Sequence, residues 1–103
     1  MDAAQIRDKV DEALSTVFDP EIPVNIVELG LVYKTEIQDG GRVMVIMTLT
    51  APGCPVAGSI IEEVTQKIEA IEGVTTADVR LTFDPPWSKD MMSEEAKLEL
   101  GFL

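Results

Sequence analysis

Five consecutive apolar residues, Val43 to Met47, most strongly limit what this chain can fold into. Such an uninterrupted run usually forms a β-strand that is covered on both faces. Asp39-Gly40-Gly41 comes just before it and is a strong signal for the turn of a hairpin. Residues 31–37, on the other side of that turn, alternate between apolar and polar as a strand does. We therefore expect residues 43–47 to lie in the middle of a sheet.

A first helix is predicted before this hairpin. Asp2 can cap it, and Gln5 stands three residues later, as in a capping box. Apolar residues then recur at helical spacing between Ile6 and Val17. The helix should end before Asp19-Pro20, because the residue ahead of a proline is forced out of the helical region.

A second helix, a third strand and a last helix are predicted after the hairpin. An apolar stripe indicates a helix from Pro55 to about Glu72, with Gly73 at its C-terminal cap. Residues 77–83 alternate like a strand with one wet face, and Ser93 can cap a short final helix. The order helix, strand, strand, helix, strand, helix predicts a two-layer α/β (α+β) fold with a mixed three-stranded sheet.

Size and charge limit the kind of protein. A chain of 103 residues, 46% of them apolar, is expected to form one soluble domain over residues 1–103. Acidic residues outnumber basic ones 19 to 8, which gives a formal charge of −11. Such a surface repels phosphate backbones and anionic membranes, so we expect neither nucleic acid nor a membrane as partner. The charge indicates either a basic protein surface as partner or only a device that keeps the protein soluble.

Cysteine and histidine usage limits the chemistry. A single cysteine cannot form an internal disulfide, which fits a reducing cytoplasm, and the absence of histidine excludes Ser-His and Cys-His catalysis. The first residues do not resemble a signal peptide, and no segment approaches the roughly 20 apolar residues that cross a bilayer. We therefore expect a cytoplasmic protein.

Cys54 is the strongest candidate for a functional residue. It lies in the segment Thr50 to Pro55, between the central strand and the second helix. Pro55 suits the first helical position, which would make Cys54 the capping residue beside free backbone N–H groups. Such a place favours the reactive thiolate, and the flanking Gly53 argues against a buried core position. From the residues alone, Cys54 could be a nucleophile, a metal ligand or neither.

Four other residues carry weaker signals. Asp19 and Glu21, on a turn stiffened by prolines, offer carboxylates for a hard cation or for proton transfer, or they simply end a helix. Glu28, in a short apolar turn, is either exposed or meets a buried backbone donor. Trp87, after two prolines, is either a cap on the core or an exposed anchor for a partner.

Several motifs together resemble a known family, and they run in order along nearly the whole chain. They are Asp19 to Pro23, Ile26 to Val32, Thr50 to Pro55, Pro85-Pro86-Trp87, Met92-Ser93 and Leu100-Gly101. This pattern resembles the SufT and PaaD-like iron–sulfur assembly factors, formerly a domain of unknown function. The resemblance implies a fold similar to the carboxyl-terminal scaffold domain of NifU.

The resemblance also implies a function: carrying iron–sulfur clusters, or bringing carriers to apo-proteins. The family's reactive cysteine falls on Cys54, and its acidic motif falls on Asp19 and Glu21. The cysteine-rich carboxyl-terminal region of PaaD is missing here, and so is the P-loop ATPase to which some relatives are fused. Both differences favour the short, stand-alone SufT-like type.

Ligand chemistry restricts how a cluster would be held. A cluster normally takes about four thiolate or equivalent ligands, and Cys54 is one. Either two chains pair through Cys54 as a homodimer, with small thiols or a partner completing the set, or no cluster is stably held. We therefore expect a non-enzymatic assembly factor with a transient cluster, working with assembly proteins and apo-targets. The alternatives are an adaptor that binds proteins through Trp87 and its acidic surface, and a thiol enzyme.

Overall fold

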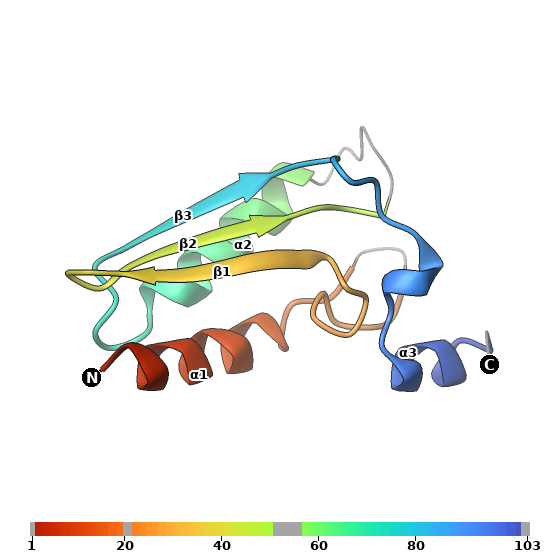
Figure 1. The fold of residues 1–103 in the computed structure, drawn as a ribbon, viewed down its shortest axis with the longest axis horizontal. Coiled ribbons are helices and arrows are strands. Elements are labelled where there is room, and N and C mark those ends of the chain that lie inside the picture. Colours follow the sequence, from red (N-terminus) through yellow and green to blue (C-terminus); the bar gives the residue numbers. More distant parts are fainter. Residues whose placement is uncertain (1, 20–21, 51–56, 102–103) are drawn as a thin grey trace.

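The computed structural model describes residues 2–19, 22–50 and 57–101, and its elements follow the predicted order (Figure 1). They are α1 (Ala3–Leu14), β1 (Val32–Gln38), β2 (Arg42–Met47), α2 (Ala57–Glu69), β3 (Thr76–Leu81), the short 3-10 helix η1 (Lys89–Met91) and α3 (Glu94–Glu99). Of the helices in these residues, none is long and apolar enough to cross a bilayer.

Strand β2 is central in the sheet, as its apolar run predicts. It pairs antiparallel with β1 and parallel with β3, so the described strands form one mixed sheet in the order β1-β2-β3. Gly40 and Gly41 make the tight β1–β2 turn, and both have a positive φ that other residues rarely adopt. The mixed three-stranded sheet is therefore confirmed.

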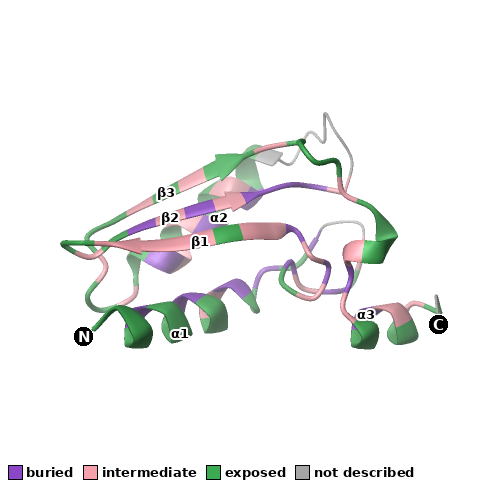
Figure 2. Ribbon diagram, in the orientation of Figure 1, coloured by how far each residue is buried: buried purple, intermediate pink, exposed green. Residues whose placement is uncertain are grey.

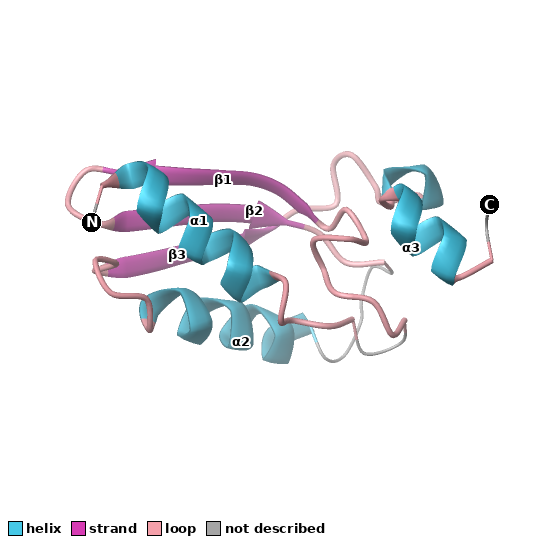
Figure 3. Cartoon of the chain, turned by 90° about the horizontal axis from the view of Figure 1, so that it is seen from below, coloured by secondary structure: helices cyan, strands magenta, loops and turns pink. Residues whose placement is uncertain are grey.

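Only one face of β2 is fully covered, so the prediction of cover on both faces is wrong. Val43, Val45 and Met47 are buried, whereas Met44 and Ile46, which alternate with them, are half-buried. Helices α1 and α2 lie side by side across the same face of the sheet (Figure 3), and Figure 2 shows the burial that follows along β2. A two-layer fold leaves the second face to water.

Charged neighbours explain how the apolar residues of the open face are tolerated. Lys34 and Arg80 lie in register on either side of Ile46. Glu36 and Asp78 lie in register on either side of Met44. Lys34 pairs with Glu36, and Arg80 pairs with Asp78 at 2.8 Å. The hydrogen bond to Asp78, and then its charge, raise the pKa of the Arg80 guanidinium. Long charged side chains can shield apolar surface in this way.

Helix α1 forms as its capping signal predicts. The Gln5 backbone N–H donates to the Asp2 carboxylate at 2.9 Å, and the Asp2 N–H donates to the Gln5 side chain at 3.0 Å. Ile6, Val10 and Leu14 form its buried stripe. Five residues after Leu14 the chain reaches Asp19, at the end of the molecule away from the hairpin.

Helix α2 is shorter at its carboxyl end than predicted. It ends at Glu69 rather than near Glu72, and the next residues form turns in which Gly73 has a φ of 94°. Ile68, like Val64, belongs to the buried side of the helix, and the helix ends one residue after it. Its predicted start at Pro55 lies outside the described residues.

The buried Thr48 provides a test of the packing. It is fully buried, and within the described residues its hydroxyl has no hydrogen-bond partner. An unsatisfied buried polar group costs about 1–3 kcal/mol, so Thr48→Val should raise the free energy of unfolding by about 1 kcal/mol. Urea unfolding measures this change.

Thr65→Val is the matched control. The Thr65 hydroxyl is part-buried, whereas that of Thr48 is fully buried, and it donates to the Ile61 carbonyl at 2.7 Å. The same substitution should therefore lower stability there, by about 0.5 kcal/mol. Equal losses at Thr48 and Thr65 would contradict the assignment of an unpaired hydroxyl.

Candidate functional site

The carboxyl end of β2 leads directly into the segment that carries Cys54. After Met47 the chain continues in an extended course, with the Thr48 N–H donating to the Leu31 carbonyl at 2.8 Å. On the other side, the Thr82 N–H donates to the Met47 carbonyl at 2.8 Å. Backbone pairing thus holds the strand end on both sides, and the approach to Thr50 is rigid.

Asp19 is a buried carboxylate at this end of the molecule. It is only 6% exposed, although aspartate is rarely buried without partners. Its Oδ1 accepts a hydrogen bond from the Ile22 N–H at 3.1 Å, and its backbone N–H donates to the Val24 carbonyl at 3.4 Å. The side chain therefore bonds to the backbone of residue 22, three positions further along the chain.

Asp19 also meets Thr50, from the other predicted motif. The Thr50 hydroxyl donates to Asp19 Oδ2 at 3.4 Å, a long hydrogen bond between residues 31 positions apart. Of the predicted site residues, the structure thus brings Asp19 and Thr50 together. The remaining predictions near them, Glu21, Gly53, Cys54 and Pro55, lie outside the described residues.

Trp87 sits elsewhere and is half-buried against the core. Its indole N–H donates to the Leu29 carbonyl at 2.7 Å, which holds the segment after β3 against the turn before β1. A Cβ on Gly30 would overlap the Met91 carbonyl in the same contact, so glycine is required there. This geometry matches the interpretation of Trp87 as a cap on the core. A partner anchor would need a fully exposed ring, and the ring of Trp87 is half-buried.

Glu28 has a partner that sequence reasoning missed. The Ser93 hydroxyl donates to the Glu28 carboxylate while accepting from the Ala96 N–H at 3.1 Å, and the Ser93 N–H donates to the Glu28 carbonyl at 2.8 Å. Ser93 was predicted as a helix cap, and it is one. One hint of this contact was present in the sequence: a serine that caps a helix accepts a hydrogen bond there and still has a hydroxyl proton to donate.

The described residues do not form a metal site. Among residues 2–19, 22–50 and 57–101, no three carboxylates, cysteines or histidines are grouped so that they could hold a metal ion. Asp19 already accepts hydrogen bonds from Ile22 and Thr50. Its carboxylate therefore connects the segment at Ile22 to the segment at Thr50 through hydrogen bonds.

Comparison with known proteins identifies the family. A family model described as "Iron-sulfur cluster assembly protein" matches residues 7–79, which include Asp19, Thr50 and Cys54 but not Trp87. The chain belongs to this family. The resemblance seen in its motifs is thereby confirmed.

Individual relatives agree with this assignment. The chain is 54% identical over 99 residues to an "Fe-S protein maturation auxiliary factor" of Porphyromonas gingivalis, covering 96% of this chain and 94% of that protein. It is 46% identical over 85 residues to the maturation auxiliary factor SufT of Staphylococcus aureus, covering 82% of this chain and 97% of SufT.

A solved structure confirms the fold. The crystal structure of a domain of unknown function from Bacillus anthracis superposes with a TM-score of 0.87. It is 37% identical in sequence, and the match covers 97% of this chain and 95% of that one. The α+β architecture is thus that of a known iron–sulfur assembly family.

A double-mutant cycle tests the contact between Asp19 and Thr50. Asp19→Asn and Thr50→Val should each destabilise the protein, and the pair should show a coupling energy of about 0.5–1 kcal/mol. Chemical unfolding of the four proteins gives this value. Asp8→Asn, on the exposed side of α1, is the control and should be additive with Thr50→Val within about 0.3 kcal/mol. Additivity of the Asp19 and Thr50 changes would contradict the contact.

Proposed function

We propose that this protein is an auxiliary factor for the maturation of iron–sulfur proteins, in which the Cys54 thiol takes part in passing clusters or cluster carriers to apo-proteins. Family membership supports the general role. The observation that carries the residue assignment is the hydrogen bond between Thr50 and Asp19.

Because Thr50 and Asp19 are in contact, the length of the chain between each of them and its neighbouring motif limits how far Cys54 and Glu21 can lie from this contact. Four residues of extended chain reach at most about 14 Å, so Cys54 lies within this distance of Thr50. Two residues reach about 7 Å, which limits Glu21 to the surroundings of Asp19 in the same way. These limits support our proposal that the thiol and the acidic motif act in one region, at the end of the central strand.

The available ligands fit a cluster as cargo and not as a resident cofactor. The chain has one cysteine and no histidine, whereas a cluster normally takes about four thiolate or equivalent ligands. Carboxylate oxygens are hard ligands and bind such clusters less well than thiolates. Cys54 can thus offer one ligand while a second chain, a small thiol or the acceptor offers the others. An acceptor with a full cysteine set then takes the cluster downhill.

The same reasoning favours a role without catalysis. Cys54 has no histidine to serve as its base and no second cysteine to resolve a disulfide. An adaptor role through Trp87 receives less support, because the indole is already bonded to Leu29. We therefore rank transfer through Cys54 above both alternatives.

The setting follows from the same features. We propose that residues 1–103 act as one domain, which the single buried cluster from Ile6 to Ala96 supports. We also place the protein in the cytoplasm, where reducing conditions keep a lone thiol free. A net charge of −11 favours protein partners over nucleic acid.

Replacing the thiol tests the proposal. Cys54→Ser should fold normally, because serine also caps a helix well, yet it should abolish the contribution of this protein to cluster maturation. The readout is the activity of an iron–sulfur enzyme in cells that depend on this factor, with the melting temperature of the purified variant measured in parallel. Full activity at an unchanged melting temperature would refute the role of the thiol. A large loss of stability would instead identify Cys54 as a packing residue.

The ligand argument makes a second prediction. Any cluster formed by anaerobic reconstitution should be labile and shared between two chains. Native mass spectrometry with and without glutathione should show a cluster on dimers, and its occupancy should rise when the thiol is added. A monomer that keeps a complete cluster without added thiol would contradict the argument.

A further inference from the structure

The exposed large apolar side chains gather at one end of the molecule. Within the described residues they lie in the connection between α1 and β1, at and just after the end of β3, and on α3: Phe18, Val27, Leu81, Phe83 and Leu98. All of these segments lie away from the β1–β2 hairpin (Figures 1 and 2). Phe18 has the larger exposed fraction of the two phenylalanines among them.

A cleft opens within this end, between the α1–β1 connection and α3. It has a volume of about 290 Å³, and Phe18, Val24 and Ala96 contribute its apolar lining. Phe18 is 55% exposed there, an unusual position for a phenylalanine that packs only in its own chain. The cleft thus offers an aromatic contact that the described chain leaves largely uncovered.

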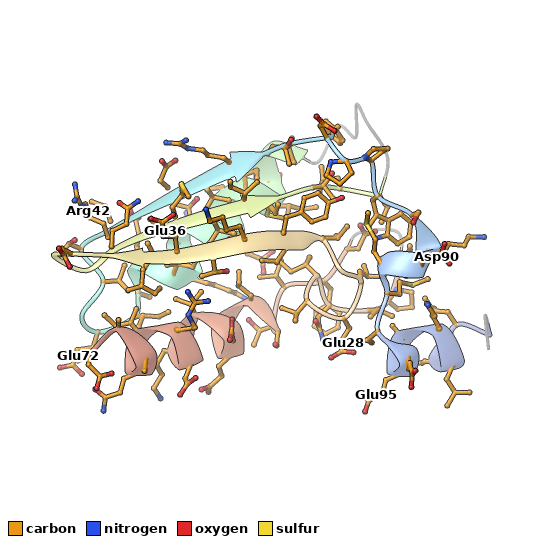
Figure 4. All side chains as sticks on the ribbon, in the orientation of Figure 1. Glu28, Glu36, Arg42, Glu72, Asp90 and Glu95 are labelled. Carbon is orange, nitrogen blue, oxygen red and sulfur yellow. The ribbon has the colours of Figure 1, made fainter. Side chains whose placement is uncertain are left out.

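Three carboxylates line the same cleft. Glu28 comes from the turn before β1, and Glu95 and Glu99 come from α3. Glu28 and Glu95 lie near each other on the underside of this end (Figure 4). Glu28 is engaged by Ser93, whereas no lysine or arginine of the described residues forms an ion pair with Glu95 or Glu99.

Glu95 lies in the first turn of α3, where the helix dipole favours an acidic side chain, but Glu99 is unfavourable for the helix. Glu95 and Glu99 are four residues apart on one face, where like charges repel. Glu99 is also the last residue of the helix, at the negative end of its dipole. A cation supplied from outside the chain would relieve both effects.

We propose that this acidic cleft docks a partner protein through a segment that places a large apolar side chain on Phe18 and lysine or arginine side chains on Glu95 and Glu99. Charge complementarity selects this partner, because a chain of net charge −11 attracts basic surfaces at long range. The inference rests on the proposed function, in which the partner is an assembly protein or an apo-protein. It assigns docking to the cleft and transfer to Cys54.

The test uses two defined probes. A fluorescein-labelled peptide of alternating lysine and leucine should bind, whereas a glutamate–leucine peptide of equal length should not, as measured by fluorescence anisotropy. Amide chemical shifts of the ¹⁵N-labelled protein should change at Phe18, Glu95 and Ala96, and not in the hairpin at residues 39–42. Equal binding of the acidic peptide, or shifts concentrated in the hairpin, would overturn the proposal.

Matched variants separate the cleft from overall charge. Glu95→Gln combined with Glu99→Gln should weaken binding of the basic peptide about tenfold. Asp8→Asn combined with Glu72→Gln removes the same charge from exposed positions outside the cleft and should change binding no more than about twofold. Equal effects of the two pairs would overturn the proposal. Phe18→Ser should weaken binding more than Leu81→Ser, and the reverse order would overturn the apolar contact.

The maturation assay keeps this inference separate from the proposed function. Cys54→Ser should leave peptide binding unchanged, whereas the Glu95 and Glu99 variant should bind peptide poorly and also slow maturation. A cleft variant that loses peptide binding but supports full maturation would overturn the docking inference alone. Full maturation by Cys54→Ser would overturn the proposed function and leave the peptide result standing.

Discussion

The central strand β2 is the constraint on which the rest of this structure depends. It is paired along both edges, so its course is determined by β1 and β3 together. Its residues Val43, Val45 and Met47 hold the helices against one face of the sheet. The chain then leaves the strand through a buried, hydrogen-bonded extension to Thr50. The position of residues 48–50 is therefore a consequence of the sheet.

The buried carboxylate of Asp19 connects this strand end to the helical layer. A carboxylate in such a place needs donors, and it finds them in the Ile22 N–H and the Thr50 hydroxyl. Both donors belong to segments that lead into the motifs singled out by the sequence. The same hydrogen bonds that satisfy the buried group thus bring the acidic motif and the approach to Cys54 together.

The helices and strands could be predicted from the sequence because caps and apolar spacing depend on residues that are close together in the chain. Asp2 and Gln5 form the expected capping box, and Ser93 caps α3. Patterns failed where tertiary packing decides. The apolar run of β2 does not reveal that helices cover only one of its faces. The alternation of β3 does not reveal that Leu81 is exposed.

The candidate site was only partly predictable for the same reason. Asp19 and Thr50 were recognised by their motifs, but their contact joins positions 31 residues apart, which no local pattern encodes. The hydrogen bond from Trp87 to Leu29 and that from Ser93 to Glu28 are likewise long-range. The burial of Asp19 could not be expected from its residue type either, because carboxylates usually lie at the surface.

Family membership shows an iron–sulfur cluster assembly protein, and our proposal is that this small acidic domain lends a single thiolate to clusters in transit. The most direct test is the rate at which a purified apo-enzyme gains its cluster from a loaded scaffold protein under anaerobic conditions. A factor that lends a ligand and releases the cluster should accelerate this transfer when present at far less than one molecule per cluster. A rate that does not change with added protein, at any ratio up to equimolar, would contradict the account.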